Sequence, residues 1–187
     1  MAWRPNGEVL DPALRARNGE SVDRLWAAWR LNYVTEDKPA ADECPFCGLE
    51  EPDEARDQER HVLYRGQHSI ALLNRYPYTN GHVLVLPFVH CDTLDGLESE
   101  VARDLHETLM STVKALRASY QPDGFNVGMN MGSAAGAGIA GHLHYHVVPR
   151  WSGDTNFMPI VGQTKVLPET LEMTWDRLRS TFETLRS

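Results

Sequence analysis

The chain of 187 residues is poor in cysteine, in basic residues and in long apolar runs. Its three cysteines are too few for the disulfide framework of a small secreted domain, which favours a reducing compartment. It has 18 basic and 26 acidic residues, a net charge of -8, whereas a nucleic-acid surface carries a basic stripe. No apolar run approaches the roughly 20 residues of a membrane span, and the N-terminal residues lack the apolar core of a signal peptide. We therefore expect a soluble cytoplasmic protein with neither a nucleic-acid nor a membrane partner.

The length suits one domain with terminal extensions. Residues 1–20 are polar and interrupted by proline and glycine, which predicts a poorly ordered N-terminal arm. We assign 21–187 to a single domain, whose N-terminal extension covers 21–60. Within that extension, aromatic and apolar residues recur at helical spacing over 22–33. We interpret this stripe as a surface that packs on the domain or on a second subunit, rather than as a cofactor platform.

The apolar pattern after residue 60 predicts an α+β domain. Apolar runs bounded by turn residues predict strands at 61–64, 69–73, 82–87, 125–131 and 141–150. Apolar residues at spacings of three and four predict a long amphipathic helix over 93–120, and a closing helix is expected over 168–186. Strands paired as hairpins, with helices on one side, indicate an antiparallel sheet of about five strands.

The most informative stretch is 141–150, which reads GHLHYHVVPR. In a strand, alternate side chains share a face, so its three histidines, His142, His144 and His146, would form one wall while the residues between them enter the core. A solvated or metal-binding histidine cluster and an affinity-tag remnant are the alternatives. A tag is not interleaved with apolar residues, so the alternation favours a functional wall of imidazoles.

Over 142–148, a histidine and an apolar residue alternate three times, and a second apolar residue follows. This pattern resembles the hallmark of the histidine triad nucleotide hydrolases and transferases. A second block upstream, LLNRYPYTNGHVLVLPFVH, is also similar to that family. The resemblance covers about 60–154, and the tail WSGDTNFMPIVGQTKV is similar to the diadenosine tetraphosphate phosphorylase-like branch. It implies the α+β histidine triad fold and a homodimer.

The resemblance gives roles to three histidines. His144 matches the nucleophile, which attacks the α-phosphorus to form a nucleotidyl-histidine and whose other ring nitrogen should donate to an oxygen. His146 matches the residue that hydrogen-bonds a phosphate oxygen and protonates the leaving group; a structural role is the alternative. His82 matches a histidine that supports the active strand, and the alternative is a strand-opening residue of no catalytic weight.

Nucleotide contacts are expected from two segments. The glycine-rich loop before the triad brings backbone amides close to an anion, as an acidic protein requires, although such loops are also simply flexible. The candidate phosphate contacts are Asn130, Ser133, Gly136, Ala137, Gly138 and His146. Asn74 matches the residue that holds the ribose hydroxyls, with a plain turn residue as the alternative. The base would lie near Leu72, Tyr76 and Tyr78.

Cys44-Pro-Phe-Cys47 has the spacing of a redox motif or of half a metal site. The resemblance to zinc-bearing branches of the superfamily and to galactose-1-phosphate uridylyltransferases implies that His90 and His142 complete the site. Cys91 is an alternative to His90 as the third ligand. A closed set of two cysteines and two histidines is typical of a structural zinc rather than a catalytic one.

The resemblance implies an enzyme that attacks the α-phosphate of a nucleotide derivative, and the similarity of the tail favours a dinucleoside polyphosphate such as diadenosine tetraphosphate. Many relatives have serine or threonine shortly before the triad, whereas this chain reads Gly-Ala-Gly-Ile over 136–139. That departure leaves the acceptor open between water and phosphate. Two other functions fit the same pattern: a nucleoside phosphoramidate or aminoacyl-adenylate hydrolase, and a zinc-stabilised nucleotide-binding module with little turnover.

Overall fold

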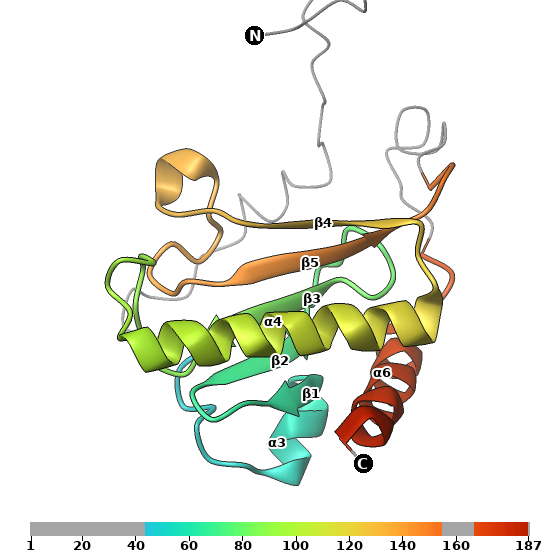
Figure 1. Ribbon diagram of the computed structural model, residues 1–187, viewed down its shortest axis with the longest axis horizontal. Helices are drawn as coiled ribbons and strands as arrows, with labels where there is room; N and C mark the ends of the chain where they lie inside the picture. Colours follow the sequence, from blue (N-terminus) through green and yellow to red (C-terminus); the bar gives the residue numbers. More distant parts are fainter. Residues whose placement is uncertain (1–43, 155–166, 187) are drawn as a thin grey trace, which may run out of the picture.

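A computed structural model describes residues 44–154 and 167–186. The described part contains one antiparallel sheet with the strand order β1-β2-β3-β5-β4 (Figure 1). The strands are β1 (Val62–Arg65), β2 (Ser69–Leu73), β3 (Val83–Pro87), β4 (Gly124–Met129) and β5 (Tyr145–Arg150). β5 therefore lies between β3 and β4, inside the sheet.

Two helices cover one face of this sheet. α4 (Ser99–Tyr120) lies in front of the sheet in Figure 1, and α6 (Leu171–Arg186) lies beside its C-terminal half. Leu105 and Leu116 of α4, and Leu178 and Phe182 of α6, are buried against inward-facing strand residues such as Val147. This is the larger hydrophobic core, and it fixes which face of β5 is left for the histidines.

The opposite face carries a smaller core, covered by the segment that contains the two spaced cysteines. Phe46 and Leu49 pack there on Ile70 and Leu72 of β2 and on Leu84 of β3. The short helix α3 (Glu54–Glu59) then leads into β1. Because side chains of a strand alternate between faces, β2 and β3 contribute to both cores and all of their residues are buried.

The predicted α+β class and the antiparallel sheet of about five strands are confirmed, but several boundaries were placed too early, and two of them have a local cause. The long helix begins at Ser99 rather than at residue 93. Gly96 lies in a tight turn, where an added Cβ would be 2.8 Å from Cys91 Sγ, and Glu98 has extended backbone angles that interrupt a helix. The first strand begins after His61, whose φ of 54° is incompatible with a strand.

Several predictions lie outside the described residues: the N-terminal arm, the helix expected over 22–33, and most of the tail after Trp151. Of the extension 21–60, the structure describes only the part from Cys44 onward. Within the described ranges, no helix combines the length and the apolar character needed to cross a bilayer.

Candidate active site and metal centre

The triad histidines precede or begin β5, and only the last of them lies within the strand. β5 begins at Tyr145, so the ladder is shorter than the strand predicted over 141–150. The reason is local: the Leu143 amide donates to the Cys91 carbonyl (2.6 Å) instead of joining a neighbouring strand. The prediction of a continuous strand was therefore wrong for its first four residues.

The alternation of faces still holds through this irregular stretch. Leu143 and Val147 are buried, and Val147 belongs to the core under the helices. His146 pairs with Leu84, which belongs to the opposite core, so His146 faces away from the helices. The ring centroids of His144 and His146 lie 5.0 Å apart. The imidazoles therefore form the predicted wall.

His144 has the hydrogen-bond pattern that a nucleophilic imidazole needs. Its side chain is only 5% exposed, and its Nδ1 lies 2.8 Å from the backbone carbonyl oxygen of His142. Because a carbonyl oxygen only accepts, Nδ1 carries the proton and Nε2 carries the lone pair. Burial lowers the pKa of His144, and the hydrogen bond to His142 opposes that shift only in part. The predicted donation to an oxygen is present, and it leaves the lone pair on Nε2.

His82 is hydrogen-bonded to His146, and a backbone amide decides the direction of that bond. The Tyr78 N–H donates to His82 Nδ1 (3.1 Å), so the proton of the neutral His82 ring is on Nε2. His82 Nε2 lies 3.0 Å from His146 Nδ1, which must then accept. The proton of neutral His146 is therefore on Nε2, and His146 presents an N–H donor.

Asn74 follows β2 directly and holds both the turn and His82. Its Oδ1 accepts from the Tyr76 N–H (2.9 Å), which closes an Asx turn, and its Nδ2 lies 3.3 Å from His82 Nδ1. The alternative of a turn residue therefore describes part of what Asn74 does. Of the residues expected near the base, Tyr78 stacks on His146 with ring centroids 5.9 Å apart, Tyr76 is exposed and Leu72 is buried in the smaller core.

The candidate phosphate loop connects β4 to the triad. Its residues Ser133–Ala135 form one 3-10 turn, η1, and the flanking Gly132 and Gly136 have φ values of 77° and 83°. Such angles favour glycine, so the glycines here are required by the backbone path. Asn130, Ala137 and Gly138 are half-buried, while Ser133 and Gly136 are exposed. The loop thus exposes its backbone in the segment that leads from β4 into the triad.

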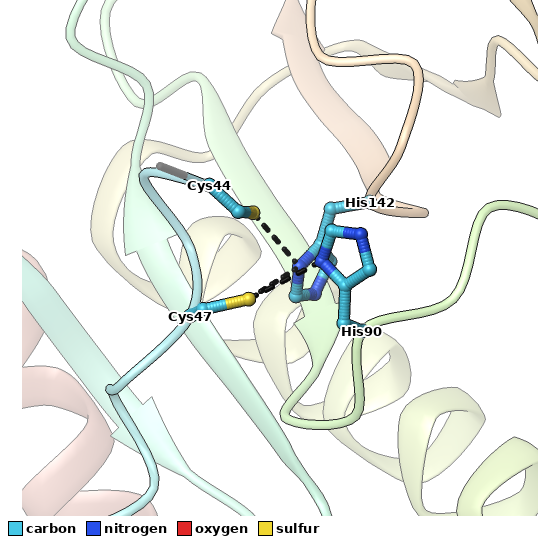
Figure 2. A group of neighbouring side chains, drawn as sticks. All are labelled: Cys44, Cys47, His90 and His142. Atoms are coloured by element: carbon cyan, nitrogen blue, oxygen red, sulfur yellow. Dashed lines mark hydrogen bonds between the residues drawn. The ribbon is translucent and has the colours of Figure 1, made fainter. Parts of the chain in front are cut away.

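Four side chains from three segments converge at the N-terminal end of the triad (Figure 2). They are Cys44, Cys47, His90 and His142. Their sulfur and nitrogen atoms all lie within 4.8 Å of one another. Three of the separations are 3.3 Å (Cys44 Sγ to His142 Nδ1), 3.2 Å (Cys47 Sγ to His90 Nδ1) and 3.8 Å (Cys47 Sγ to His142 Nδ1). Ligand atoms of a tetrahedral zinc are about 3.3–3.8 Å apart, so these three separations are within about 0.1 Å of the spacing of such a site.

The protonation pattern of the four side chains also suits a cation. His142 Nε2 lies 2.9 Å from the Pro87 carbonyl oxygen, so it carries the proton and Nδ1 is left to face the sulfurs. Burial lowers the pKa of His142, and repulsion from His90 and His144 lowers it further. Burial and the neighbouring Cys44 raise the pKa of Cys47 to about 11. Two thiols placed together in this way are stabilised as thiolates by a bound cation.

The structure separates the two candidates for the third ligand. His90 belongs to the convergent group, and its ring lies 5.3 Å from that of His142. Cys91 Sγ instead donates to the Thr93 carbonyl (3.1 Å). The arrangement therefore favours His90 over Cys91.

One residue that the sequence did not single out also lies in this region. Phe46 stands between the two cysteines, and its ring centroid lies 5.5 Å from those of both His142 and His144. The spacing of Cys44 and Cys47 indicates a cysteine pair but gives no role to the residues between them, so nothing in the sequence pointed to this contact.

Comparisons with known proteins agree with this geometry. The model of the HIT domain family matches residues 55–153. A protein of Mycobacterium tuberculosis (strain CDC 1551 / Oshkosh) named AP-4-A phosphorylase is 37% identical over 159 residues, which cover 83% of this chain and 82% of that protein. A bis(5'-adenosyl)-triphosphatase of Saccharomyces cerevisiae (strain YJM789) is 32% identical over 91 residues, covering 48% of this chain and 44% of that protein.

Solved structures show the same fold. A structure described as a Zn-bound histidine triad family protein from Mycobacterium smegmatis has a TM-score of 0.61 and 27% identity. The matched part covers 77% of this chain and 96% of that chain. A hypothetical histidine triad nucleotide-binding protein from Sulfolobus tokodaii strain7 has a TM-score of 0.61 and 26% identity, covering 76% and 94%. With the family model spanning more than half of the sequence, the chain belongs to the HIT domain family.

Proposed function

We propose that this HIT-family enzyme cleaves dinucleoside polyphosphates such as diadenosine tetraphosphate through a nucleotidyl-His144 intermediate. The names of two relatives, an AP-4-A phosphorylase and a bis(5'-adenosyl)-triphosphatase, support this substrate class. The observation that carries the proposal is the 2.8 Å contact of His144 Nδ1 with the His142 carbonyl, because it leaves Nε2 with a lone pair.

In the first step, His144 Nε2 attacks the α-phosphorus and forms an N–P bond, while the bond from that phosphorus to the bridging oxygen breaks. Negative charge develops on the departing oxygen, and His146 stabilises it with a hydrogen bond from Nε2–H, the nitrogen that its hydrogen bond with His82 leaves protonated. In the second step, water or inorganic phosphate attacks the same phosphorus and His144 leaves. Water yields AMP from an adenylylated enzyme, and phosphate yields ADP.

The nucleotide would be held beside this wall. We assign the phosphate to backbone and side-chain groups of the loop, and the ribose to Asn74. The positive-φ glycines and the exposed backbone of η1 support an anion site in a chain whose net charge is -8. Asn130, Ser133, Gly136, Ala137 and Gly138 are the candidates within reach of it.

Zinc is part of the proposal as a structural ion. Cys44, Cys47, His90 and His142 would hold it with no open coordination position, and bound zinc would supply a fixed charge that joins the cysteine segment to the triad. The related Mycobacterium smegmatis structure described as Zn-bound supports this assignment. His142 then has no contact with substrate.

We also propose a cytoplasmic homodimer, as the family resemblance implies. The strand β4 is at the edge of the sheet, and Val127 on it is 46% exposed, which supports a further contact there. Light scattering of the purified protein tests this: a mass near twice 21.1 kDa is expected, and a single-chain mass would contradict it.

The enzyme assay uses purified protein and diadenosine tetraphosphate, with and without inorganic phosphate, and resolves the nucleotides by anion-exchange chromatography. ADP plus ATP formed only with phosphate would identify a phosphorylase, and AMP plus ATP in either buffer would identify a hydrolase. The variant His144→Gly is the control and should form neither. Absence of product with wild-type protein would contradict the proposal, and AMP-lysine would then test the phosphoramidate alternative.

A further inference from the structure

We propose that Phe46 is a positioning residue for His144, so that the cysteine segment holds the nucleophile in its reactive orientation. This inference rests on the proposed function only where it treats His144 as the nucleophile. The contact itself is independent of any reaction.

The ring of Phe46 contacts two of the three triad histidines, His142 and His144. It is 7% exposed and lies between Cys44 and Cys47 in the sequence. Its ring meets that of His142 edge-on (5.5 Å between centroids, 81° between planes) and that of His144 at a tilt (5.5 Å, 60°). One side chain therefore touches a proposed metal ligand and the proposed nucleophile.

Two features of His144 leave the tilt of its ring to side-chain packing. The hydrogen bond from Nδ1 to His142 fixes one ring nitrogen, but a single hydrogen bond does not fix the tilt of the ring about it. The backbone of His144 also lies outside the strand ladder, which begins at Tyr145. In the described residues, the aromatic rings beside His144 are those of His146 (5.0 Å between centroids) and Phe46 (5.5 Å). His146 is itself hydrogen-bonded to His82, so of these two rings Phe46 is the one that packs on His144 as an apolar surface and limits its tilt.

The position of Phe46 is in turn set by the segment that carries it. Its neighbours in the smaller core include Leu49, Ile70 and Leu72, and the Cys47 N–H donates to the Cys44 carbonyl (3.2 Å), which closes the turn around Phe46. Whatever holds the two cysteines in place therefore holds the Phe46 ring against His144. This gives the cysteine segment a second task besides ligating an ion.

The first test measures the single-turnover rate of nucleotidyl-enzyme formation in Phe46→Ala and Phe46→Leu, with zinc content and melting temperature determined for each. A misplaced nucleophile costs about 100-fold in rate, so we expect about that loss for Phe46→Ala and a smaller loss for Phe46→Leu, which keeps most of the volume. The substrate KM should change less than about twofold, because Phe46 is not assigned to the nucleotide. Phe88→Leu is the matched control, since Phe88 packs on the same core and its ring faces the Arg65 guanidinium at 5.9 Å; it should react like wild type.

The second test does not depend on turnover. Long-range ¹H–¹⁵N NMR of the imidazoles should show a shifted or broadened His144 ring in zinc-loaded Phe46→Ala, and a wild-type ring in Phe88→Leu. If Phe46→Ala loses zinc, Phe46→Leu provides the comparison. A wild-type rate together with an unchanged His144 signal in zinc-loaded Phe46 variants would overturn the proposal. If wild-type protein forms no nucleotidyl-enzyme, the proposed function falls, and the NMR comparison alone decides the role of Phe46.

Discussion

His142 and His144 are two histidines only two positions apart, yet the structure gives their neutral rings different tautomers. His142 donates from Nε2 to the Pro87 carbonyl and directs Nδ1 toward two sulfurs. His144 donates from Nδ1 to the His142 carbonyl and keeps the lone pair on Nε2. The difference lies in which ring nitrogen meets a backbone carbonyl oxygen: Nε2 in His142 and Nδ1 in His144. A histidine motif therefore does not define a reaction until each ring has its hydrogen-bond partner.

The comparison predicts that the two residues fail in different ways when replaced. His144→Gly should lower turnover of diadenosine tetraphosphate by about 10,000-fold or more, because no other group can form the covalent intermediate. Its zinc content should stay close to that of wild type, since His144 is not one of the four convergent side chains, whereas its melting temperature should fall because removal of the buried ring leaves a cavity. Steady-state assays with calorimetry of nucleotide binding check this. Activity near that of wild type would remove His144 from the role of nucleophile.

Removal of zinc from the site that includes His142 should lower the stability of the protein. Free zinc at about 1,000 times its Kd contributes about 4 kcal/mol to stability, which for a chain of this size corresponds to roughly 8–16 °C in melting temperature. We expect a loss of that order after treatment with a chelator, measured by differential scanning calorimetry alongside elemental analysis. Purified protein that contains near-zero zinc without exposure to a chelator, and melts at the same temperature with added zinc, would contradict a structural zinc.

Loss of the hydrogen bond between His82 and His146 should have a smaller effect, and a double-mutant cycle tests it directly. His82→Ala should lower kcat by about 100-fold, because His146 then loses the donor that keeps its proton on Nε2. His146→Ala should cost at least as much, and the double variant should be no worse than His146→Ala alone, since both act through one proton. Independent, multiplicative effects in this double-mutant cycle would show that His82 acts in some other way.

The smallest expected effect concerns the third ligand. Cys91→Ser should leave zinc content unchanged and stability within about 1 kcal/mol of wild type, because a hydroxyl can still donate to the Thr93 carbonyl. His90→Ala, its matched partner, should lose zinc because it removes a member of the convergent group. Zinc analysis of both variants checks this, and the reverse pattern would make Cys91 the ligand.

Much of the fold followed from local patterns. The α+β class, the antiparallel sheet and the long helix were predicted from alternation and from spacings of three and four, because burial of one face imposes those periods. Two of the predicted boundaries that were wrong, at residues 93 and 141, lie where long-range packing outweighs the local pattern. Cys91 lies near both, through its sulfur beside Gly96 and its carbonyl bonded to Leu143.

The site was predicted less completely. The resemblance supplied the residue set that converges in the structure, including four metal-ligating candidates, but their roles are still proposals. Phe46 was missed because a residue between two cysteines has no pattern of its own. Its contact with His144 joins residues 46 and 144, and only the packing of the cysteine segment on the sheet creates that pair.

The sequence by itself determined which side chains are present, which of them alternate along the triad, and therefore the kinds of chemistry that the chain can carry. The tertiary structure decided which nitrogen of each imidazole keeps its proton and which four side chains converge. The physical reason is that these choices depend on partners far away in the chain. Pro87 lies 55 residues from His142, and Cys44 lies 98 residues from it. A local pattern contains no information about contacts across such separations until the sheet has formed.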